Sequence, residues 1–284
     1  MEVIRARKAG FCMGVALALH KLYMLVAAEG GKKVATLGEI IHNPQVLESY
    51  ARRGVSCLKS ADEADADMSV LIRAHGIPRS VEMRLREQCP DVEDATCPRV
   101  KKAQTAIAAS TAEGRVLLLY GEADHPEVRG LISYAAGESR IFSSEVELDV
   151  LLEAEDFSNR QLVLAAQTTQ DRFIFDAIRK RMESRFGEAL VVLDTICDAT
   201  RERQEDALAV ASRVQAMVVV GGRTSGNTKR LAELTGARVP AVLVETADEL
   251  DMAFFAGMER VGLTAGASTP RQIIDKVEER LRLA

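Results

Sequence analysis

Residues 97–128 read CPRVKKAQTAIAASTAEGRVLLLYGEADHPEV, and this stretch holds the order of elements that sets the fold. Cys97 opens a helix-like segment, the run VLLLY is continuously apolar, and a glycine-led turn containing His125 follows. A continuous apolar run of this length is typical of a strand that is buried on both faces. We therefore expect a helix, a buried strand and a polar loop, in that order.

The same order occurs three times along the chain. Each copy contains a cysteine, a helix, a strand, a polar turn, a further helix and strand, and a second polar turn. The polar residue of the first turn follows its cysteine by 30, 28 and 28 residues, and that of the second turn by 63, 71 and 71 residues. The copies begin at Cys12, Cys97 and Cys197, have His42, His125 and Ser225 in the first turn, and have His75, Thr168 and Ser268 in the second. Such self-similarity predicts repeated structural units.

Short β-rich runs alternate with helix-like stretches, which predicts an α/β fold with mainly parallel sheets covered by helices on both faces. The runs are KVATLG, SVLIRA, RVLLLY, LVLAAQ, ALVVLDT, AMVVVGG, PAVLVET and RVGLTA. We expect three similar α/β units at residues 13–97, 98–194 and 195–284, with residues 1–12 packing at the centre. Polar loops leave the carboxyl ends of parallel strands, where such sheets bind ligands. Arranged about a pseudo-threefold axis, the units would direct three cysteines and six polar loops into one central cavity.

Composition and charge argue against several classes of function. The chain has 284 residues, of which 47% are hydrophobic, and its net charge of −5 comes from interspersed charges, so we expect no binding to nucleic acid or to a membrane. No apolar run approaches the roughly 20 residues of a spanning helix, and the start of the chain lacks the apolar core of a signal peptide. Its five cysteines are an odd number in a chain that needs no disulfide framework. We expect a cytoplasmic protein whose thiols are free for metal binding or catalysis.

Cys12, Cys97 and Cys197 are candidate metal ligands. A thiolate at a helix start is stabilised by the positive end of the helix dipole, and cysteine is not a preferred capping residue. The three could instead be small buried hydrophobic residues, or could hold zinc, although structural zinc sites usually take close cysteine pairs, which this chain lacks. Ligands from three distant repeats favour a cubane iron–sulfur cluster with one iron left without a cysteine. Cys57 and Cys89 lie outside the repeat and are expected to be structural.

The polar loops could bind a phosphorylated ligand. Three of the four histidines lie in these loops, and the segments TSGNT and GAST supply hydroxyl and amide groups at expected helix starts. Such groups are often only helix caps, but at a helix start they can also donate hydrogen bonds to an anion. Their combination with the cysteines favours a diphosphate site. Its candidate residues are His42, Ser225, Asn227 and Ser268.

Glu127 is a candidate proton donor, although a glutamate in the first turn of a helix can simply compensate the dipole. In a cavity that holds a diphosphate and thiolates, the pKa of this carboxyl should rise, and a neutral carboxyl can donate a proton. Thr168 is expected to relay or orient that proton.

The chain resembles the LytB family of 4-hydroxy-3-methylbut-2-enyl diphosphate reductases over essentially its whole length. The resemblance rests on nine motifs in the same order: GFCMGV, EIIHNPQV, IRAHGIP, DATCPRV, HPEV, QTT, DTICDAT, SGNT and TAGAS. It implies a [4Fe–4S] cluster on Cys12, Cys97 and Cys197 at the centre of a three-unit trefoil. It also implies that two electrons from ferredoxin or flavodoxin, with two protons, remove the substrate hydroxyl as water. The products would be isopentenyl and dimethylallyl diphosphate, in the last step of the non-mevalonate isoprenoid pathway.

The resemblance also implies roles for individual residues. Glu127, with His125 and Thr168, matches the catalytic positions that deliver protons. The substrate would be bound by His42, His75, His125, Thr168, Ser225, Gly226, Asn227 and Ser268. Gly226 stands where some members of the family have a second serine, and its backbone N–H could replace that hydroxyl as a donor.

Two other functions stay open. A hydro-lyase also uses an open-iron cubane as a Lewis acid, but it turns over without a reductant. A sensor that binds a phosphorylated ligand through zinc or a cluster would show no turnover, and it would have no need of a proton donor such as Glu127.

Overall fold

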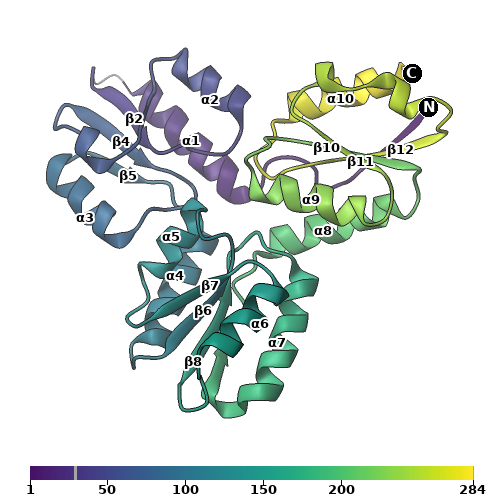
Figure 1. Cartoon of the computed structure of the whole chain (residues 1–284). Coiled ribbons are helices and arrows are strands. Elements are labelled where there is room, and N and C mark those ends of the chain that lie inside the picture. Colours follow the sequence, from purple (N-terminus) through teal and green to yellow (C-terminus); the bar gives the residue numbers. More distant parts are fainter. Residues whose placement is uncertain (29–30, 284) are drawn as a thin grey trace. The chain divides into compact units, whose positions relative to one another are not determined.

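The structure is a computed structural model and describes residues 1–28 and 31–283. It contains three four-stranded sheets, all parallel, whose strands alternate with helices along the chain (Figure 1). The predicted α/β class with parallel sheets is therefore confirmed. Packing groups the chain into two compact units: unit 1 is Met1–Ala16, Ile41–Arg52 and Asp198–Ala284, and unit 2 is Leu17–Ile40 and Arg53–Cys197. The division at 13–97, 98–194 and 195–284 and the arrangement about an axis stay predictions.

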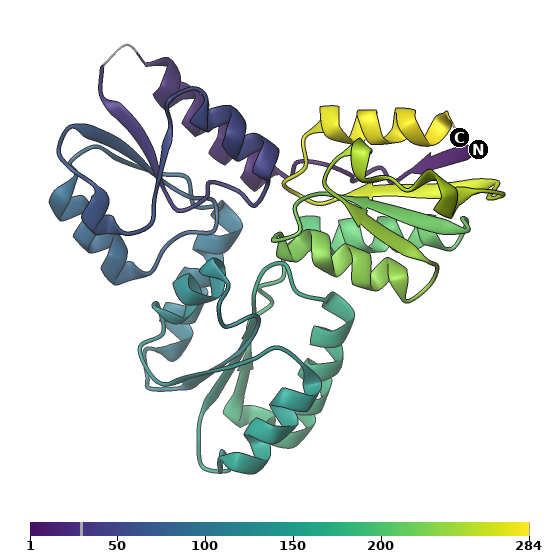
Figure 2. The same ribbon diagram turned by 45° about the horizontal axis from the view of Figure 1, so that its top comes forward.

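Unit 1 contains one sheet with the strand order β1-β12-β10-β11. Its strands are β1 (Glu2–Arg5), β10 (Ala216–Val220), β11 (Ala241–Val244) and β12 (Arg260–Ala265). Helix α10 lies on one face of the sheet and α8 and α9 lie on the other (Figure 2), and apolar side chains of these helices pack against the strands. The helices of this unit are α2 (Pro44–Ala51), α8 (Asp198–Ala211), α9 (Gly226–Gly236), η3 (Ala247–Glu249), η4 (Met252–Phe255) and α10 (Arg271–Arg282).

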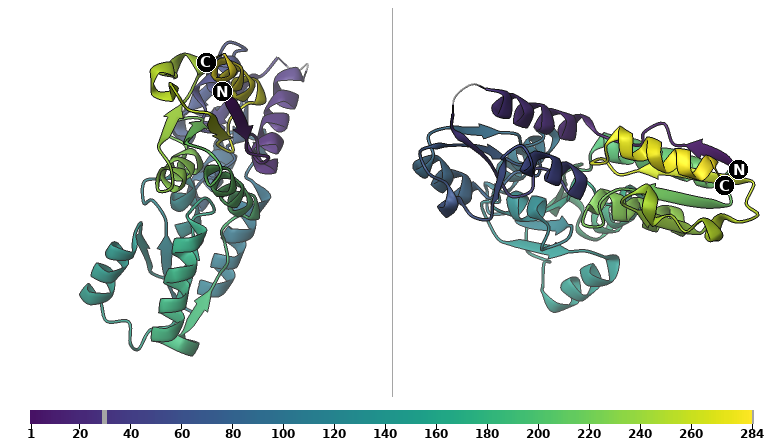
Figure 3. Two further views of the ribbon diagram at one scale, coloured as in Figure 1. Left: turned by 90° about the vertical axis from the view of Figure 1, so that its right-hand side faces the viewer. Right: turned by 90° about the horizontal axis from the view of Figure 1, so that it is seen from above.

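The start of the chain forms an edge strand of unit 1, and the expectation that residues 1–12 pack at the centre stays a prediction. Glu2–Arg5 form the edge strand β1, which lies beside α10 (Figure 3). Val3 packs into the apolar core of the sheet, and Arg5 pairs with Asp275 of α10 at 2.6 Å. Burial of an apolar side chain and pairing with β12 therefore hold this segment at the sheet edge.

Unit 2 contains the other two sheets, with the strand orders β3-β2-β4-β5 and β7-β6-β8-β9. The first comprises β2 (Lys33–Leu37), β3 (Ser56–Leu58), β4 (Met68–Ile72) and β5 (Val92–Asp94). The second comprises β6 (Val116–Tyr120), β7 (Ser139–Phe142), β8 (Leu162–Ala166) and β9 (Leu190–Val192). The helices are α3 (Arg79–Gln88), α4 (Pro98–Thr111), α5 (Pro126–Ile132), α6 (Glu145–Ala154), α7 (Arg172–Phe186), η1 (Ala61–Glu63) and η2 (Gly187–Ala189), while α1 (Met13–Ala27) begins in unit 1 and continues into unit 2.

The second sheet of unit 2 shows why its strands are continuously apolar. Leu118 and Leu164 pack with α6 and α7, whereas Leu117 and Val163 pack with α4 and α5. Because alternate residues point to opposite faces, both sets must be apolar when helices cover both faces. Figure 1 shows α6 and α7 on one side of this sheet and α4 and α5 on the other.

None of the helices in the two described ranges combines the length and the apolar composition that a membrane span requires.

Candidate active site

A buried carboxyl group lies at the carboxyl ends of β6 and β8 in unit 2. Glu127 belongs to the first turn of α5, which follows β6, and is only 1% exposed. Its Oε1 accepts the Thr168 N–H at 2.6 Å, and its Oε2 accepts the Thr168 hydroxyl at 2.9 Å. The structure thus brings these two candidate residues together, and their catalytic role stays a prediction.

Burial raises the pKa of Glu127 to about 7, although the backbone and hydroxyl hydrogen bonds from Thr168 both act to lower it. Loss of hydration therefore destabilises the charged carboxylate by more than the two hydrogen bonds from Thr168 stabilise it. A carboxyl with a pKa near neutral pH holds its proton part of the time and can deliver it to a reacting group.

Two histidines lie near the start of α5, the helix that carries Glu127. His125 caps α5, and its Nδ1 accepts the Glu127 N–H at 3.1 Å. A neutral ring that accepts at Nδ1 carries its proton on Nε2, so Nε2–H is the donor of this ring. His75 lies in the loop after β4, and the two rings make an edge contact with centroids 5.4 Å apart. Two histidine rings and a buried carboxyl that can hold a proton therefore lie at the start of α5.

Each candidate cysteine is held by the same kind of backbone hydrogen bond. The N–H of Cys97 donates to Ala74 at 2.9 Å, and that of Cys197 donates to Thr168 at 3.0 Å, both within unit 2. In unit 1 the N–H of Cys12 donates to Ala267 at 3.1 Å. Every one of these cysteines directly precedes a helix, and every acceptor lies in the loop after a strand.

The burial and the contacts of the five thiols distinguish the three candidate ligands from the other two cysteines. Cys12, Cys97 and Cys197 are half-buried and form no disulfide within the described residues. Cys89 is fully buried, and its thiol donates to the Met68 carbonyl at 3.3 Å. Cys57 is exposed and bonds to a neighbouring side chain. Three half-buried thiols at helix starts suit iron or another thiophilic metal, because sulfur ligands bind such metals preferentially.

These hydrogen bonds correct one predicted equivalence between the repeats. Thr168 and Ser268 both follow their cysteines by 71 residues, which suggests equivalent positions. The structure instead matches Thr168 with Ala267, because their carbonyls accept the corresponding cysteine N–H groups. From its cysteine to this carbonyl, the second copy is therefore one residue longer than the third. Thr168 and Ser268 do not hold equivalent positions, although their spacing from the cysteine is equal.

In unit 1 the starts of α2 and α9 and the loop after β12 meet. The side chain of Ser225 caps α9, and the Ser268 hydroxyl donates to the His42 carbonyl at 3.0 Å. A Cβ at Gly222 would lie 2.6 Å from the same His42 oxygen, so the close approach of these two loops requires glycine. Four candidates for diphosphate binding therefore lie on adjoining loops of unit 1: His42, Ser225, Asn227 and Ser268.

Two buried amide groups in unit 1 have donors without a partner. Asn43 is 1% exposed and caps α2 with its Oδ1, and Asn227 is 5% exposed in the first turn of α9. For neither Nδ2 does the structure record a hydrogen bond to any described residue. A buried donor left unpaired costs about 1–3 kcal/mol, so we expect both amides to donate to a ligand. Gly226, beside Asn227, adds a backbone N–H at the start of α9, where an anion is favoured.

Asn43 is a functional candidate that the sequence reasoning did not single out. His42 was predicted at the helix start, whereas Asn43 occupies the cap position that His125 and Ser225 hold in the other copies. The available signal was the pair Asn43–Pro44, which is typical of a helix cap followed by the first helical residue.

Asn43→Ser is expected to separate capping from ligand binding. Serine keeps an oxygen that can accept the Val46 N–H, so the free energy of unfolding should change by less than about 1 kcal/mol. The amide donor is lost, so KM for a diphosphate substrate should rise by about tenfold, the effect of one hydrogen bond to a charged group. Steady-state kinetics with thermal denaturation would measure both. An unchanged KM would show that Nδ2 does not contact the substrate.

The comparisons with known proteins agree with each other. Residues 3–282 match the family model described as LytB protein. A 4-hydroxy-3-methylbut-2-enyl diphosphate reductase of Nitratidesulfovibrio vulgaris (strain DP4) is 52% identical, with 99% of each chain covered. One of the same name from Geobacter sulfurreducens is 42% identical, covering 99% of this chain and 97% of that one.

Two solved structures are similar in fold. The E-1-hydroxy-2-methyl-but-2-enyl-4-diphosphate reductase of Plasmodium falciparum has a TM-score of 0.91 at 25% identity, over 98% of this chain and 87% of that one. A (E)-4-hydroxy-3-methyl-but-2-enyl diphosphate reductase, described as the terminal enzyme of the non-mevalonate pathway, has a TM-score of 0.68 at 37% identity, over 100% of both chains. With a family model that matches nearly all of its residues and relatives of this similarity, the chain belongs to the LytB protein family.

Proposed function

We propose that this protein reduces 4-hydroxy-3-methylbut-2-enyl diphosphate to isopentenyl and dimethylallyl diphosphate, the last step of the non-mevalonate isoprenoid pathway. The observation that carries the proposal is the buried Glu127, whose pKa is about 7 and which is hydrogen-bonded to Thr168. Family membership and the names of the relatives support the same substrate. The reaction breaks the C–O bond of the substrate hydroxyl, consumes two electrons and two protons, and releases water.

We propose that Cys12, Cys97 and Cys197 hold a [4Fe–4S] cluster. Three half-buried thiols at helix starts, none of them in a disulfide among the described residues, fit three of its irons and leave one iron without a cysteine. When bound, the cluster supplies a Lewis acid for the leaving oxygen and a path for the electrons. We expect ferredoxin or flavodoxin to provide these electrons in the cytoplasm, where reducing conditions keep cysteine thiols free.

The side chains of unit 1 are proposed to hold the diphosphate. These residues of unit 1 provide neutral donors and helix starts rather than lysine or arginine. The anion would therefore be held by directed N–H and O–H groups. Asn43 and Asn227 have buried amide donors without a partner among the described residues, and such an anion would accept hydrogen bonds from both. The remaining proposed contacts are His42, Ser225, Gly226 and Ser268 in unit 1, and His75 and His125 in unit 2.

The side chains of unit 2 are proposed to deliver the proton that leaves with the hydroxyl as water. The Glu127 carboxyl is the proton source, and the Thr168 hydroxyl, 2.9 Å from it, can orient or relay that proton. Nε2–H of His125 would bind and orient the substrate beside them. Placing donor and reacting group in fixed geometry lowers the barrier by removing the cost of bringing them together.

Anaerobically purified protein tests this function directly. Analysis is expected to find about four irons and four acid-labile sulfides per chain, with the visible absorption and spin-resonance signals of a cubane cluster. Product should form only when a reductant is supplied, and removal of iron with a chelator should abolish it. Turnover without reductant would indicate a hydro-lyase instead, and a colourless protein with bound zinc would exclude the cluster.

A further inference from the structure

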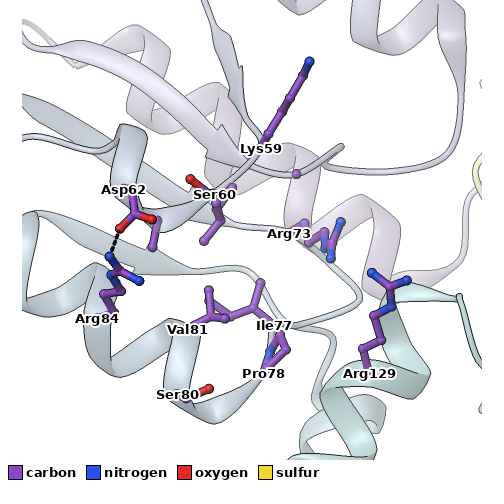
Figure 4. A pocket seen from close by; sticks show the side chains of 13 residues that line it. Lys59, Ser60, Asp62, Arg73, Ile77, Pro78, Ser80, Val81, Arg84 and Arg129 are labelled. Atoms are coloured by element: carbon purple, nitrogen blue, oxygen red, sulfur yellow. Dashed lines mark ion pairs between the residues drawn. The ribbon is translucent and has the colours of Figure 1, made fainter.

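Unit 2 contains a cavity outside the candidate active site, with a volume of about 400 Å³ (Figure 4). Among its lining side chains four are cations and only one is an acid, in a chain whose net charge is −5. The cations are Lys59, Arg73, Arg84 and Arg129, and the acid is Asp62. Such a local excess of positive charge marks a place where an anion would be stabilised.

Among the three arginines of this cavity, Arg73 is the one whose charge has no recorded carboxylate partner in the described residues. It follows β4 and is half-buried, and its Nε donates to the Gly76 carbonyl at 3.3 Å. No ion pair of Arg73 with a carboxylate is recorded in the described part of the chain. Burial lowers the pKa of Arg73, and the like charge of Arg129 lowers it further, while Cys57 and Glu39 act in the opposite direction.

The other cations are partly neutralised or point elsewhere. Arg84 pairs with Asp62 at 2.5 Å, and Lys59 extends away from the arginines (Figure 4). Arg129 bonds to the exposed Asp124 at 2.9 Å and reaches toward the same space as Arg73 (Figure 4). Two guanidinium groups therefore share one end of the cavity, close enough to repel each other.

The neighbouring wall of the cavity is apolar. Ile77, Pro78 and Val81 lie next to the two arginines, on the loop after β4 and the first turn of α3 (Figure 4). An arginine pair beside an apolar wall suits an amphiphilic ligand with a phosphate head, because guanidinium groups bind phosphate oxygens in pairs. The volume is within the range of cavities that hold small ligands.

We propose that this cavity binds a phosphate or diphosphate group through Arg73 and Arg129, with a short apolar tail of the ligand against Ile77 and Val81. An anion at this position would neutralise two like charges that otherwise repel. The cavity and the candidate active site take residues from the same segments of the chain. The Arg73 side chain bonds to the Gly76 carbonyl in the loop that contains His75, and Arg129 lies on α5 with Glu127. The proposal does not depend on the reaction, since it concerns binding alone.

Hydrogen exchange of the holoenzyme, measured anaerobically without reductant, tests the proposal. Inorganic diphosphate and isopentenyl diphosphate are added in separate titrations. Isopentenyl diphosphate is expected to protect residues 59–62 and 77–84, and to bind at least as tightly as inorganic diphosphate. Arg129→Gln should raise the concentration for half-protection of these segments at least ~10-fold, as expected for loss of a charged hydrogen bond. Protection of residues 225–231, at the start of α9, should not change in this variant.

Arg179→Gln is the matched control. It removes a partly exposed arginine that bonds to Glu183 at 2.9 Å on α7, in the same unit but outside the cavity, and should leave all titrations unchanged. Failure to protect residues 59–62 and 77–84 at concentrations that protect 225–231 would overturn the proposal. An unchanged concentration for half-protection in Arg129→Gln would also overturn it. Tighter binding of inorganic diphosphate than of isopentenyl diphosphate would contradict the placement of the apolar tail against Ile77 and Val81.

Discussion

Cys97→Ser is expected to lose most of the bound iron and to lower turnover by at least ~100-fold. A serine hydroxyl stays protonated at neutral pH and binds iron far less well than a thiolate, and even groups that only orient a metal ligand change metal affinity by about 10–100-fold. The variant should still fold, because the backbone N–H that bonds to Ala74 is retained and the side chain of residue 97 makes no capping hydrogen bond. Iron and sulfide analysis with reductant-dependent product formation would measure the effect.

Cys57→Ser is the matched control for this experiment. It makes the same chemical change at an exposed thiol outside the repeated pattern, so iron content and turnover should stay near those of the unmodified protein. Full iron content and turnover in Cys97→Ser would contradict the assignment of Cys97 as a ligand. Loss of iron in both variants would show that the effect is not specific to the three helix-start cysteines.

The eight strands with long apolar runs were predictable from the sequence, whereas four short strands were not. The missed strands are β1, β3, β5 and β7, each of three or four residues and each at a sheet edge. An edge strand such as Val92–Asp94 is only half-buried and too short to show a periodic pattern. Its position depends on pairing with β4, which local sequence does not encode.

The candidate site shows a similar limit. The rise in the pKa of Glu127 was predicted from the anions expected around it, and the direction agrees with the structure, but the largest cause there is burial. Burial of this side chain depends on how α5 packs, which residue types alone do not reveal. Asn43 was missed for the same reason: a helix-cap signal is visible in the sequence, but an amide donor left without a partner is visible only once the loops are placed.

Glu127→Gln is expected to keep the cluster and substrate binding but to lose about 10²–10⁴-fold in turnover, the usual contribution of a general acid. Glutamine has nearly the same shape, and its Oε1 can still accept the Thr168 N–H, so the fold should be retained. Its amide does not release a proton to the leaving oxygen. Iron content and substrate affinity should therefore stay near the unmodified values while kcat falls.

The pH dependence of turnover gives an independent check on this residue. Burial raises the pKa of Glu127 to about 7, and the negative charge of a bound diphosphate should raise it further. The active form is the protonated one, so kcat should be highest below this pKa and fall about tenfold per pH unit above it. Glu127→Gln should lack this decline, because no group titrates at that position.

Glu145→Gln serves as the control for charge at a helix start. Glu145 also lies in the first turn of a helix, α6 of the same unit, but it is exposed. If Glu127 only compensated the dipole of α5, both variants would lose a few tenths of a kcal/mol of stability and neither would lose turnover. A large loss of kcat in Glu127→Gln alone, together with the missing alkaline decline, would assign the proton to the buried carboxyl. Near-normal kcat in both variants would remove Glu127 from the reaction.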